Sequence, residues 1–219
     1  PATETLVELA VQWARERGGP VRMLDVCTGS GCVAISVVAA LVTPRRGTTE
    51  PPVSPMEATA VASDLVPAAI DLALRNATRH GLQARIEFRT GDLFESLQAS
   101  EAEGFDLITA NPPYISDAEW AQCEPNVRDH EPATALRGGG DGLRIVTPLL
   151  QQAPRWLKPG GRLLVEIAAS QGEAVQRLVQ ANAALVHRAV QKDHEGLDRV
   201  LVADRARVQD VKLIVNRAA

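Results

Sequence analysis

The stretch Leu24-Asp25-Val26-Cys27-Thr28-Gly29-Ser30-Gly31 decides the fold. It ends a short apolar run that begins at Val21, and it leads into residues 31–41, whose apolar pattern predicts a helix. Glycines in such a strand–turn–helix unit let the backbone approach a ligand and take positive φ angles, and the helix N-terminus offers free N–H groups. The unit is typical of nucleotide-binding α/β sheets, although an ordinary strand-to-helix turn would read similarly.

Strand-like and helix-like segments alternate along the rest of the chain, which predicts an α/β fold. The expected strands are residues 21–26, 58–63, 85–89, 105–110, 162–168, 186–190 and 199–203. The expected helices are residues 3–17, 31–41, 67–80, 142–157 and 171–181. Residues 43–57, rich in Pro and Thr, predict a surface loop, and Lys158-Pro159-Gly160-Gly161 predicts a turn. We expect one domain over residues 1–204, followed by a charged tail over 205–219 to which the sequence assigns no structure.

Length and composition are those of a soluble globular domain, with 219 residues of which 45% are hydrophobic and 23% charged. The net charge of −4 and the lack of a basic run argue against direct contact with nucleic acid. Cys27, Cys32 and Cys123 are odd in number and lack metal-ligand spacing, so they indicate reduced thiols in a cytoplasmic protein and no metal site. We find no membrane-spanning run and no signal peptide. The chain begins at Pro1 within helix-like sequence, which suggests that an N-terminal region is missing.

Acidic residues follow the next two expected strands. Asp64 closes the second, where a carboxylate can accept hydrogen bonds from both hydroxyls of a ribose. It is equally suited to cap the helix that has Pro67 in its first turn. Gly91-Asp92-Leu93 ends the third strand, where it would either border an adenine ring or form a plain surface turn. Both positions are therefore candidates for binding a nucleotide-like ligand.

Asn111-Pro112-Pro113-Tyr114 follows the buried strand 105–110, at the edge where α/β sheets bind ligands. Two prolines fix φ and remove two N–H donors, so the stretch is expected to be rigid, with its carbonyls unpaired and facing outward. The Asn111 side-chain oxygen and the Pro112 carbonyl would accept both hydrogens of one –NH2 group. Tyr114, the only tyrosine, would stack on a flat group or face a cationic methyl donor. The motif predicts methylation of a planar amide or amine nitrogen.

Taken in order, these motifs resemble the class I S-adenosylmethionine methyltransferases that act on amino groups. Further stretches resemble the HemK-type protein-(glutamine-N5) methyltransferases, which modify peptide-chain release factors. These stretches are residues 127–136, Gly139-Gly140-Asp141-Gly142-Leu143, residues 157–161, Glu166-Ile167, Gln171-Gly172-Glu173, Lys192-Asp193, Gly196 and Asp198-Arg199-Val200. The resemblance covers nearly all of the chain up to Asp204.

The resemblance implies a Rossmann-like, seven-stranded, mostly parallel sheet with helices on both faces and an antiparallel closing strand. It implies S-adenosyl-L-methionine as cofactor, with the methionine end at residues 27–31, the ribose at Asp64 and the adenine beside Leu93. The expected cofactor-binding residues are Asp25, Cys27, Thr28, Gly29, Ser30, Gly31, Asp64, Asp92, Leu93 and Asn111. Those expected to hold the substrate amide are Asn111, Pro112, Pro113 and Tyr114, of which Asn111, Pro112 and Tyr114 are the expected catalytic residues.

The substrate implied by the resemblance is the glutamine of a Gly-Gly-Gln loop in a release factor, methylated directly by the cofactor. We expect a cytoplasmic monomer with no membrane, metal or nucleic-acid partner. Three features depart from the family pattern: Cys27 stands where many relatives have Gly or Ala, Ala2 replaces an acidic residue, and the loop 43–57 is long. The family's N-terminal helical domain, which is expected to help bind the release factor, is expected to be absent.

Three other functions compete with this hypothesis. An exocyclic amine of adenine or guanine in a nucleic acid poses the same chemical problem to an Asn-Pro-Pro-Tyr motif, but the acidic balance argues against it. A glutamine of a ribosomal protein is a second alternative acceptor. The third is a non-catalytic subunit that binds the cofactor and activates a partner, which the intact motif at 111–114 disfavours.

Overall fold

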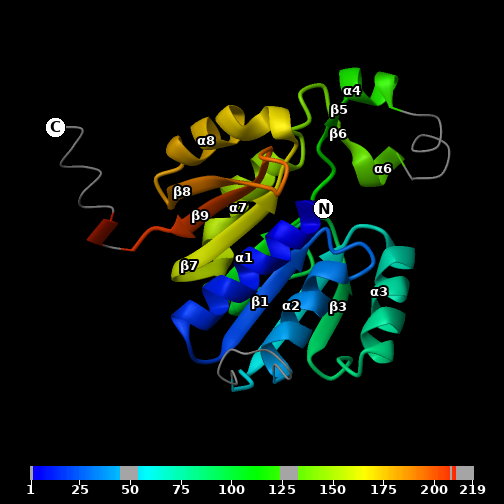
Figure 1. Ribbon diagram of the computed structural model, residues 1–219, viewed down its shortest axis with the longest axis vertical. Coiled ribbons are helices and arrows are strands. Elements are labelled where there is room, and N and C mark those ends of the chain that lie inside the picture. The colour runs from blue at the N-terminus through cyan, green and yellow to red at the C-terminus, as the bar shows by residue number, and fades with distance from the viewer. Residues whose placement is uncertain (1, 45–53, 124–132, 208, 211–219) are drawn as a thin grey trace.

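The computed structural model describes residues 2–44, 54–123, 133–207 and 209–210 (Figure 1). Its principal strands are β1 Val21–Val26, β2 Ala58–Asp64, β3 Ile86–Thr90, β4 Phe105–Ala110, β7 Leu157–Glu166, β8 Leu185–Lys192 and β9 Asp198–Arg205. Its principal helices are α1 Ala2–Arg17, α2 Cys32–Val42, α3 Pro67–Arg79, α7 Val146–Trp156 and α8 Gly172–Gln180. Parts of three predicted segments lie outside the described residues: 45–53 of the surface loop, 127–132 of the family-like stretch and most of the tail.

The principal strands form one sheet in the order β3-β2-β1-β4-β7-β9-β8. The pairs β1–β2, β1–β4, β2–β3 and β4–β7 are parallel, whereas β9 is antiparallel to both of its neighbours, β7 and β8. The predicted seven-stranded, mostly parallel sheet with an antiparallel closing strand is confirmed. Since β1, β2, β4 and β7 run in one direction, their carboxyl ends meet at a single edge of the sheet.

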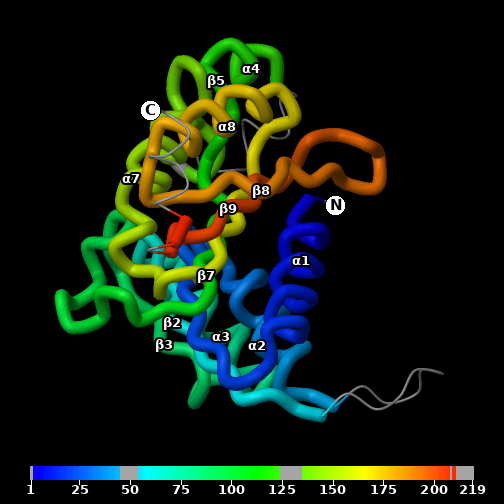
Figure 2. The backbone as a smooth tube through the Cα atoms, turned by 90° about the vertical axis from the view of Figure 1, so that its left-hand side faces the viewer, coloured from blue at the N-terminus to red at the C-terminus, as the bar shows by residue number. Residues whose placement is uncertain are grey.

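Helices cover both faces of this sheet, and α1 and α7 lie on its opposite sides (Figure 2). Side chains alternate between the faces along each strand, so Met23 packs in the core formed with α1 and α2 while Leu24 packs in the core formed with α7 and α8. Both side chains are at most 1% exposed. Burial on both faces explains the continuous apolar runs of the central strands.

Several boundaries differ from the sequence prediction, and two of these differences change how a segment is interpreted. The predicted helix 142–157 begins only at Val146, which places Pro148 in the first turn, where its missing N–H breaks no helical hydrogen bond. The predicted turn 158–161 lies inside β7. Phe105 of β4 pairs with Leu157 and Leu107 pairs with Arg162, so the turn is an insertion between two paired positions of one strand.

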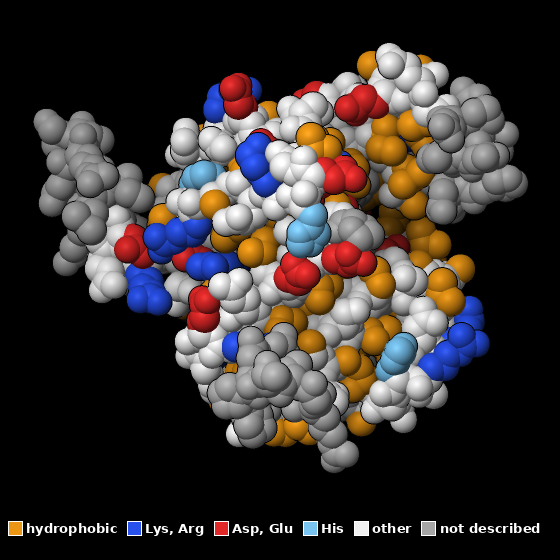
Figure 3. Space-filling model, in the orientation of Figure 1, with side chains coloured by type: hydrophobic (Ala, Val, Ile, Leu, Met, Phe, Trp, Pro, Cys, Tyr) orange, Lys and Arg blue, Asp and Glu red, His pale blue; other side chains and the backbone are white. Residues whose placement is uncertain are grey.

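The sequence analysis missed a small lobe that follows the motif at 111–114. It consists of β5 Ile115–Ser116, α4 Asp117–Gln122, α6 Ala133–Leu136 and β6 Arg137–Gly139, with β5 and β6 paired in parallel (Figure 1). Such short strands lack the alternating pattern that identifies a strand in sequence. Hydrophobic side chains gather where this lobe meets the main body (Figure 3). Among the described helices, none has the length and apolar character needed to cross a membrane.

Candidate active site

The predicted site residues come together at the carboxyl edge of the sheet. Residues 27–31 follow β1, Asp64 ends β2, residues 91–93 follow β3, and residues 111–114 follow β4. Hydrogen bonds link three of these segments directly: Thr28 N–H donates to the Ser63 carbonyl at 3.0 Å, and Ser63 Oγ donates to the Leu93 carbonyl at 3.3 Å. The edge therefore carries all four segments that were predicted to bind the cofactor and the substrate amide.

Asp25, near the end of β1, holds the loop that follows this strand through hydrogen bonds. Its side chain is 1% exposed, with Thr28 Oγ1 donating to Oδ2 at 2.6 Å and Thr109 Oγ1 donating to Oδ1 at 2.6 Å. Burial raises the pKa of Asp25 to about 6, while the two hydroxyl hydrogen bonds lower it and so offset part of the burial effect. Thr109 lies on β4, so one carboxylate joins β1, its loop and the strand that leads to Asn111.

Strained backbone marks the predicted cofactor loops. Within the described residues, only three non-glycine residues have positive φ, and two of them are Cys27 at 57° and Leu93 at 47°. The left-handed region is unfavourable for residues with a Cβ, by about 1–2 kcal/mol each. Such strain persists where the surrounding structure enforces it, and it clusters at ligand sites. Burial raises the pKa of the Cys27 thiol to about 12, so this thiol is neutral and no nucleophile.

Asp64 holds the glycine turn rather than capping a helix. Its Oδ2 accepts the Gly29 N–H and its Oδ1 accepts the Val66 N–H, both at 2.9 Å. The N-cap of α3 is Val66, so the capping alternative is wrong. Each carboxylate oxygen has a second lone pair, which leaves Asp64 able to accept further hydrogen bonds from a ligand.

The glycine turn also packs tightly against α3. Gly31 has φ of +79°, and a Cβ added there would lie 3.0 Å from the Cβ of Ala73. Asn76, also on α3, donates its side-chain N–H to the Ser30 carbonyl at 2.9 Å. At Gly29, with φ of +56°, an added Cβ would meet no atom within 4 Å, so this glycine borders open space. The turn is therefore held against α3 at Ser30 and Gly31, and it borders open space at Gly29.

The other side of the site is a cluster around Glu166, the last residue of β7. Glu166 Oε2 accepts the Thr3 hydroxyl at 2.9 Å, and its Oε1 accepts the Tyr114 hydroxyl at 3.1 Å. Asn111 Nδ2 in turn donates to Thr3 Oγ1 at 3.3 Å. Burial and the neighbouring carboxylate raise the pKa of Tyr114 to about 12, so its hydroxyl keeps its proton. The cluster joins α1, β7 and the predicted substrate motif.

The backbone of residues 111–114 is only partly unpaired, which corrects the expectation from sequence. The Tyr114 carbonyl accepts the Gln171 side-chain N–H at 3.0 Å, and the same Gln171 accepts the Ala168 N–H at 3.0 Å. Within the described residues, no hydrogen bond reaches the Pro112 carbonyl. The carbonyl that was predicted to receive a substrate hydrogen is therefore available.

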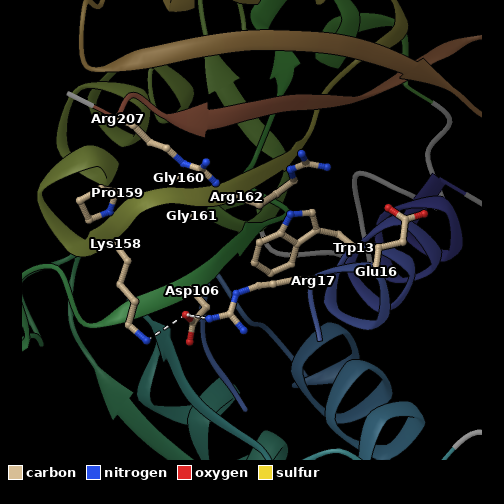
Figure 4. A pocket seen from close by; sticks show the side chains of 10 residues that line it. All are labelled: Trp13, Glu16, Arg17, Asp106, Lys158, Pro159, Gly160, Gly161, Arg162 and Arg207. Atoms are coloured by element: carbon tan, nitrogen blue, oxygen red, sulfur yellow. Dashed lines mark hydrogen bonds and ion pairs between the residues drawn. The ribbon is translucent and has the colours of Figure 1, made fainter. Parts of the chain in front are cut away.

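A recess lies at the opposite edge of the sheet, away from the candidate site (Figure 4). Asp106, near the start of β4, accepts ion pairs from Arg17 at 2.7 Å and Lys158 at 2.8 Å there, and Arg162 pairs with Asp204 at 2.7 Å. These ion pairs connect α1, β4, β7 and β9. These ion pairs hold neighbouring elements together, and they lie at the edge of the sheet opposite to Asn111.

Comparison with known proteins gives the family. The sequence profile of a family described as "Methyltransferase domain" matches residues 19–205. The chain belongs to this methyltransferase family. The match runs from just before β1 to the end of β9, so it includes the whole principal sheet of the methyltransferase domain.

Curated relatives are similar over most of the chain. Proteins named release factor glutamine methyltransferase from Cereibacter sphaeroides and Gloeobacter violaceus are 41% and 36% identical over 93% and 92% of this chain. A protein named ribosomal protein uL3 glutamine methyltransferase, from Bordetella pertussis, is 40% identical over 76% of this chain. The chain spans 64% of each of the first two relatives and 50% of the third, less than two thirds of their lengths.

Solved structures share the fold at low sequence identity. A ribosomal protein L11 methylase from Lactobacillus delbrueckii subsp. bulgaricus superimposes with a TM-score of 0.62 at 18% identity, covering 94% of this chain and 79% of that one. An O-methyltransferase from Bacillus cereus, solved in complex with SAH, gives a TM-score of 0.59 at 16% identity, covering 93% of this chain and 80% of that one. These similarities show a common methyltransferase fold.

Sequence analysis assigned no role in the site to three residues that the structure places there, although it named Glu166 within a family-like stretch. Thr109 is a fully buried hydroxyl in an apolar strand, and Glu166 is an acid that ends a buried strand beside β4, as Asp64 ends β2. Both patterns are visible in the sequence and could have identified these residues. Thr3 has no such signal. It lies 163 positions from Glu166 along the chain, and only the packing of α1 in the fold brings the two side chains together.

Alanine at the two glycines of the turn separates backbone strain from crowding. Gly29→Ala should lose about 1–2 kcal/mol of the free energy of unfolding, because only its φ is unfavourable. Gly31→Ala has the same strain and also places its Cβ against Ala73 and Ile35, so it should lose a further amount of about 1–3 kcal/mol. Urea denaturation of both variants measures this difference, and equal losses would contradict the tight packing of the turn on α3.

The Asp25 carboxyl should make stability depend on pH. Its folded-state pKa of about 6 exceeds the ordinary 3.8, so the folded protein binds this proton more tightly than the unfolded chain. The stabilisation is therefore full below about pH 4 and is lost as pH rises through about 6. Asp25→Asn lacks this dependence, so the variant's free energy of unfolding relative to wild type should rise by about 2 kcal/mol between about pH 4.5 and pH 7. A difference that stays constant with pH would refute the assignment.

Proposed function

We propose that this chain transfers a methyl group from S-adenosyl-L-methionine to the side-chain amide nitrogen of a glutamine in a peptide-chain release factor. The observation that carries the proposal is the position of Asn111, directly after β4, at the edge that also holds residues 27–31 and Asp64. Relatives named release factor glutamine methyltransferase, at 36–41% identity, support the choice of acceptor.

The residues at the edge suit this cofactor. Gly29 borders open space at positive φ, and Cys27 and Leu93 also have positive φ, in loops at the same edge. Residues 27–31 would hold the methionine end, Asp64 the ribose hydroxyls, and Asp92 and Leu93 the adenine. When bound there, the cofactor supplies an electrophilic methyl group on a sulfonium.

The substrate amide would lie against residues 111–114. Asn111 Oδ1 and the Pro112 carbonyl accept the two amide hydrogens, which fixes the nitrogen and favours a localised lone pair. Pro113 holds this backbone rigid, and Tyr114 presents its ring to the flat group. The nitrogen–methyl bond forms as the methyl–sulfur bond breaks, and the nitrogen releases one proton to solvent. The protein contributes orientation and electrostatics.

Several further properties belong to the same proposal. Residues 1–204 would form the catalytic domain, acting as a monomer in the cytoplasm. The free thiols of Cys27, Cys32 and Cys123 are in keeping with a reducing compartment. We expect recognition of the rest of the release factor to involve regions outside this domain, since the relatives are longer than this chain.

A glutamine of a ribosomal protein is the second candidate acceptor. The relative from Bordetella pertussis named ribosomal protein uL3 glutamine methyltransferase, 40% identical to this chain, favours it. The chemistry at residues 111–114 would be the same for both acceptors, so the assay below has to include both.

Methyl transfer to purified acceptors tests the proposed function. The protein is incubated with isotopically labelled S-adenosyl-L-methionine and a release factor, and the modified residue is mapped by mass spectrometry. We expect a single methyl group on the glutamine of the Gly-Gly-Gln loop and none on a release factor with Gly-Gly-Glu. Ribosomal protein uL3, RNA and DNA are tested in parallel. Label on a residue other than glutamine, or on nucleic acid alone, would overturn the proposal.

Asn111→Ala tests the role of the motif. Removing an acceptor that orients the reacting nitrogen should lower kcat by about 100- to 1,000-fold. The dissociation constant of the cofactor, measured by calorimetry, should change far less, because Asp64 and residues 27–31 hold most of it. An equal loss of affinity and rate would show that Asn111 acts mainly through the cofactor.

A further inference from the structure

Asn111 belongs to a chain of hydrogen bonds that ends on a buried carboxylate. Asn111 Nδ2 donates to Thr3 Oγ1 at 3.3 Å, and the Thr3 hydroxyl donates to Glu166 Oε2 at 2.9 Å. The second oxygen, Oε1, accepts the Tyr114 hydroxyl at 3.1 Å. Glu166 is 2% exposed, so water does not compete for these bonds.

This chain of bonds has one possible direction. An ionised carboxylate can only accept hydrogen bonds, so the Thr3 hydroxyl must use its single hydrogen to donate a bond to Glu166. Thr3 Oγ1 can then only accept from Asn111, and of the two ends of an amide only the nitrogen donates. The Asn111 side chain is thereby fixed with its –NH2 group toward Thr3 and its oxygen Oδ1 on the other end of the amide, away from this bond.

Burial and the neighbouring groups act in opposite directions on the ionisation of Glu166. Burial is the largest influence and raises the pKa of Glu166 above its ordinary value, while hydrogen bonds from Thr3, Tyr114 and Asn111 and the positive charge of Arg199 offset part of this rise. Arg199 is on β9 and also pairs with Asp193 at 2.8 Å. Three donors and one cation, from α1, residues 111–114 and β9, thus face a single carboxylate and favour its ionised form.

We propose that Thr3 and Glu166 are positioning residues that hold the Asn111 amide with its oxygen toward the substrate nitrogen. The two ends of an Asn side chain have nearly the same shape but opposite roles. A flipped amide would point two N–H donors at the N–H groups of the substrate, so the substrate nitrogen would be repelled instead of bound. The rate consequence of this inference rests on the proposed function, whereas the amide orientation does not.

Substitutions of Thr3 separate the hydroxyl from the shape of the side chain. Thr3→Val keeps the shape and removes the hydroxyl, whereas Thr3→Ser keeps the hydroxyl. The matched control is Thr5→Val, on the same helix: Thr5 is 7% exposed, and among the described residues its Oγ1 has no hydrogen-bond partner. Glu166→Gln probes the other end, because a glutamine amide can donate to Thr3 and so reverse the direction of the chain.

The first readout is the Asn111 side-chain amide in two-dimensional 15N NMR spectra, assigned by its absence in Asn111→Ala. In wild type, Thr3→Ser and Thr5→Val, we expect one of its two protons to be shifted and protected from exchange by the bond to Thr3. In Thr3→Val and Glu166→Gln this protection should be lost. An unchanged Asn111 signal in Thr3→Val would overturn the inference, whatever the enzyme methylates.

The second readout is the rate of methyl transfer. Thr3→Val should lower kcat by about 10- to 100-fold with unchanged cofactor affinity, because the reacting nitrogen is no longer held in line. Thr3→Ser should recover most of this rate, and Thr5→Val should match wild type. Equal losses in Thr3→Val and Thr5→Val would reduce Thr3 to a structural role. If wild type methylates no glutamine, the proposed function fails, and the NMR result still decides the orientation of Asn111.

Discussion

The buried Asp25 carboxylate is the interaction on which the rest of the site depends. A charge with 1% exposure is strongly unfavourable unless donors surround it, and here two threonine hydroxyls do so at 2.6 Å. Thr28 belongs to the loop after β1, and Thr109 lies two residues before Asn111 on β4. One carboxylate therefore sets the spacing between the loop proposed for the cofactor and the motif proposed for the substrate.

Several features at the same edge of the sheet destabilise the folded state. Cys27 and Leu93 have left-handed backbone, which glycine would adopt without strain, and Asp25 is buried at a raised pKa. Each of these features opposes folding, and each lies at the carboxyl edge of the sheet, Asp25 near the end of β1 and the other two in loops. The two cores on either side of the sheet offset this cost, because they bury long apolar side chains from every central strand.

Sequence periodicity predicted the sheet well because its strands are buried on both faces and separated by amphipathic helices. It failed where the chain departs from those periods. The turn at 158–161 lies within a strand because Leu157 still pairs with Phe105 before the insertion, a contact between distant segments. The small lobe has strands of two and three residues, too short for any pattern. In the candidate site, the residues after β1, β2, β3 and β4 were predicted and Glu166 at the end of β7 was overlooked, whereas Thr3 could not be predicted because its position depends on the packing of α1.

The hydrogen bonds around Glu166 explain why an Asn-Pro-Pro-Tyr motif is by itself a general sign of nitrogen chemistry. The motif provides an amide whose two ends are sterically alike, and nothing within residues 111–114 fixes which end faces a substrate. That choice comes from Thr3, 108 positions away, and from a carboxylate on the neighbouring strand. A carboxylate suits this task because it can only accept, so it imposes one direction on every bond that leads to it. The orientation of the motif is thus a property of the fold, carried by residues that the motif does not contain.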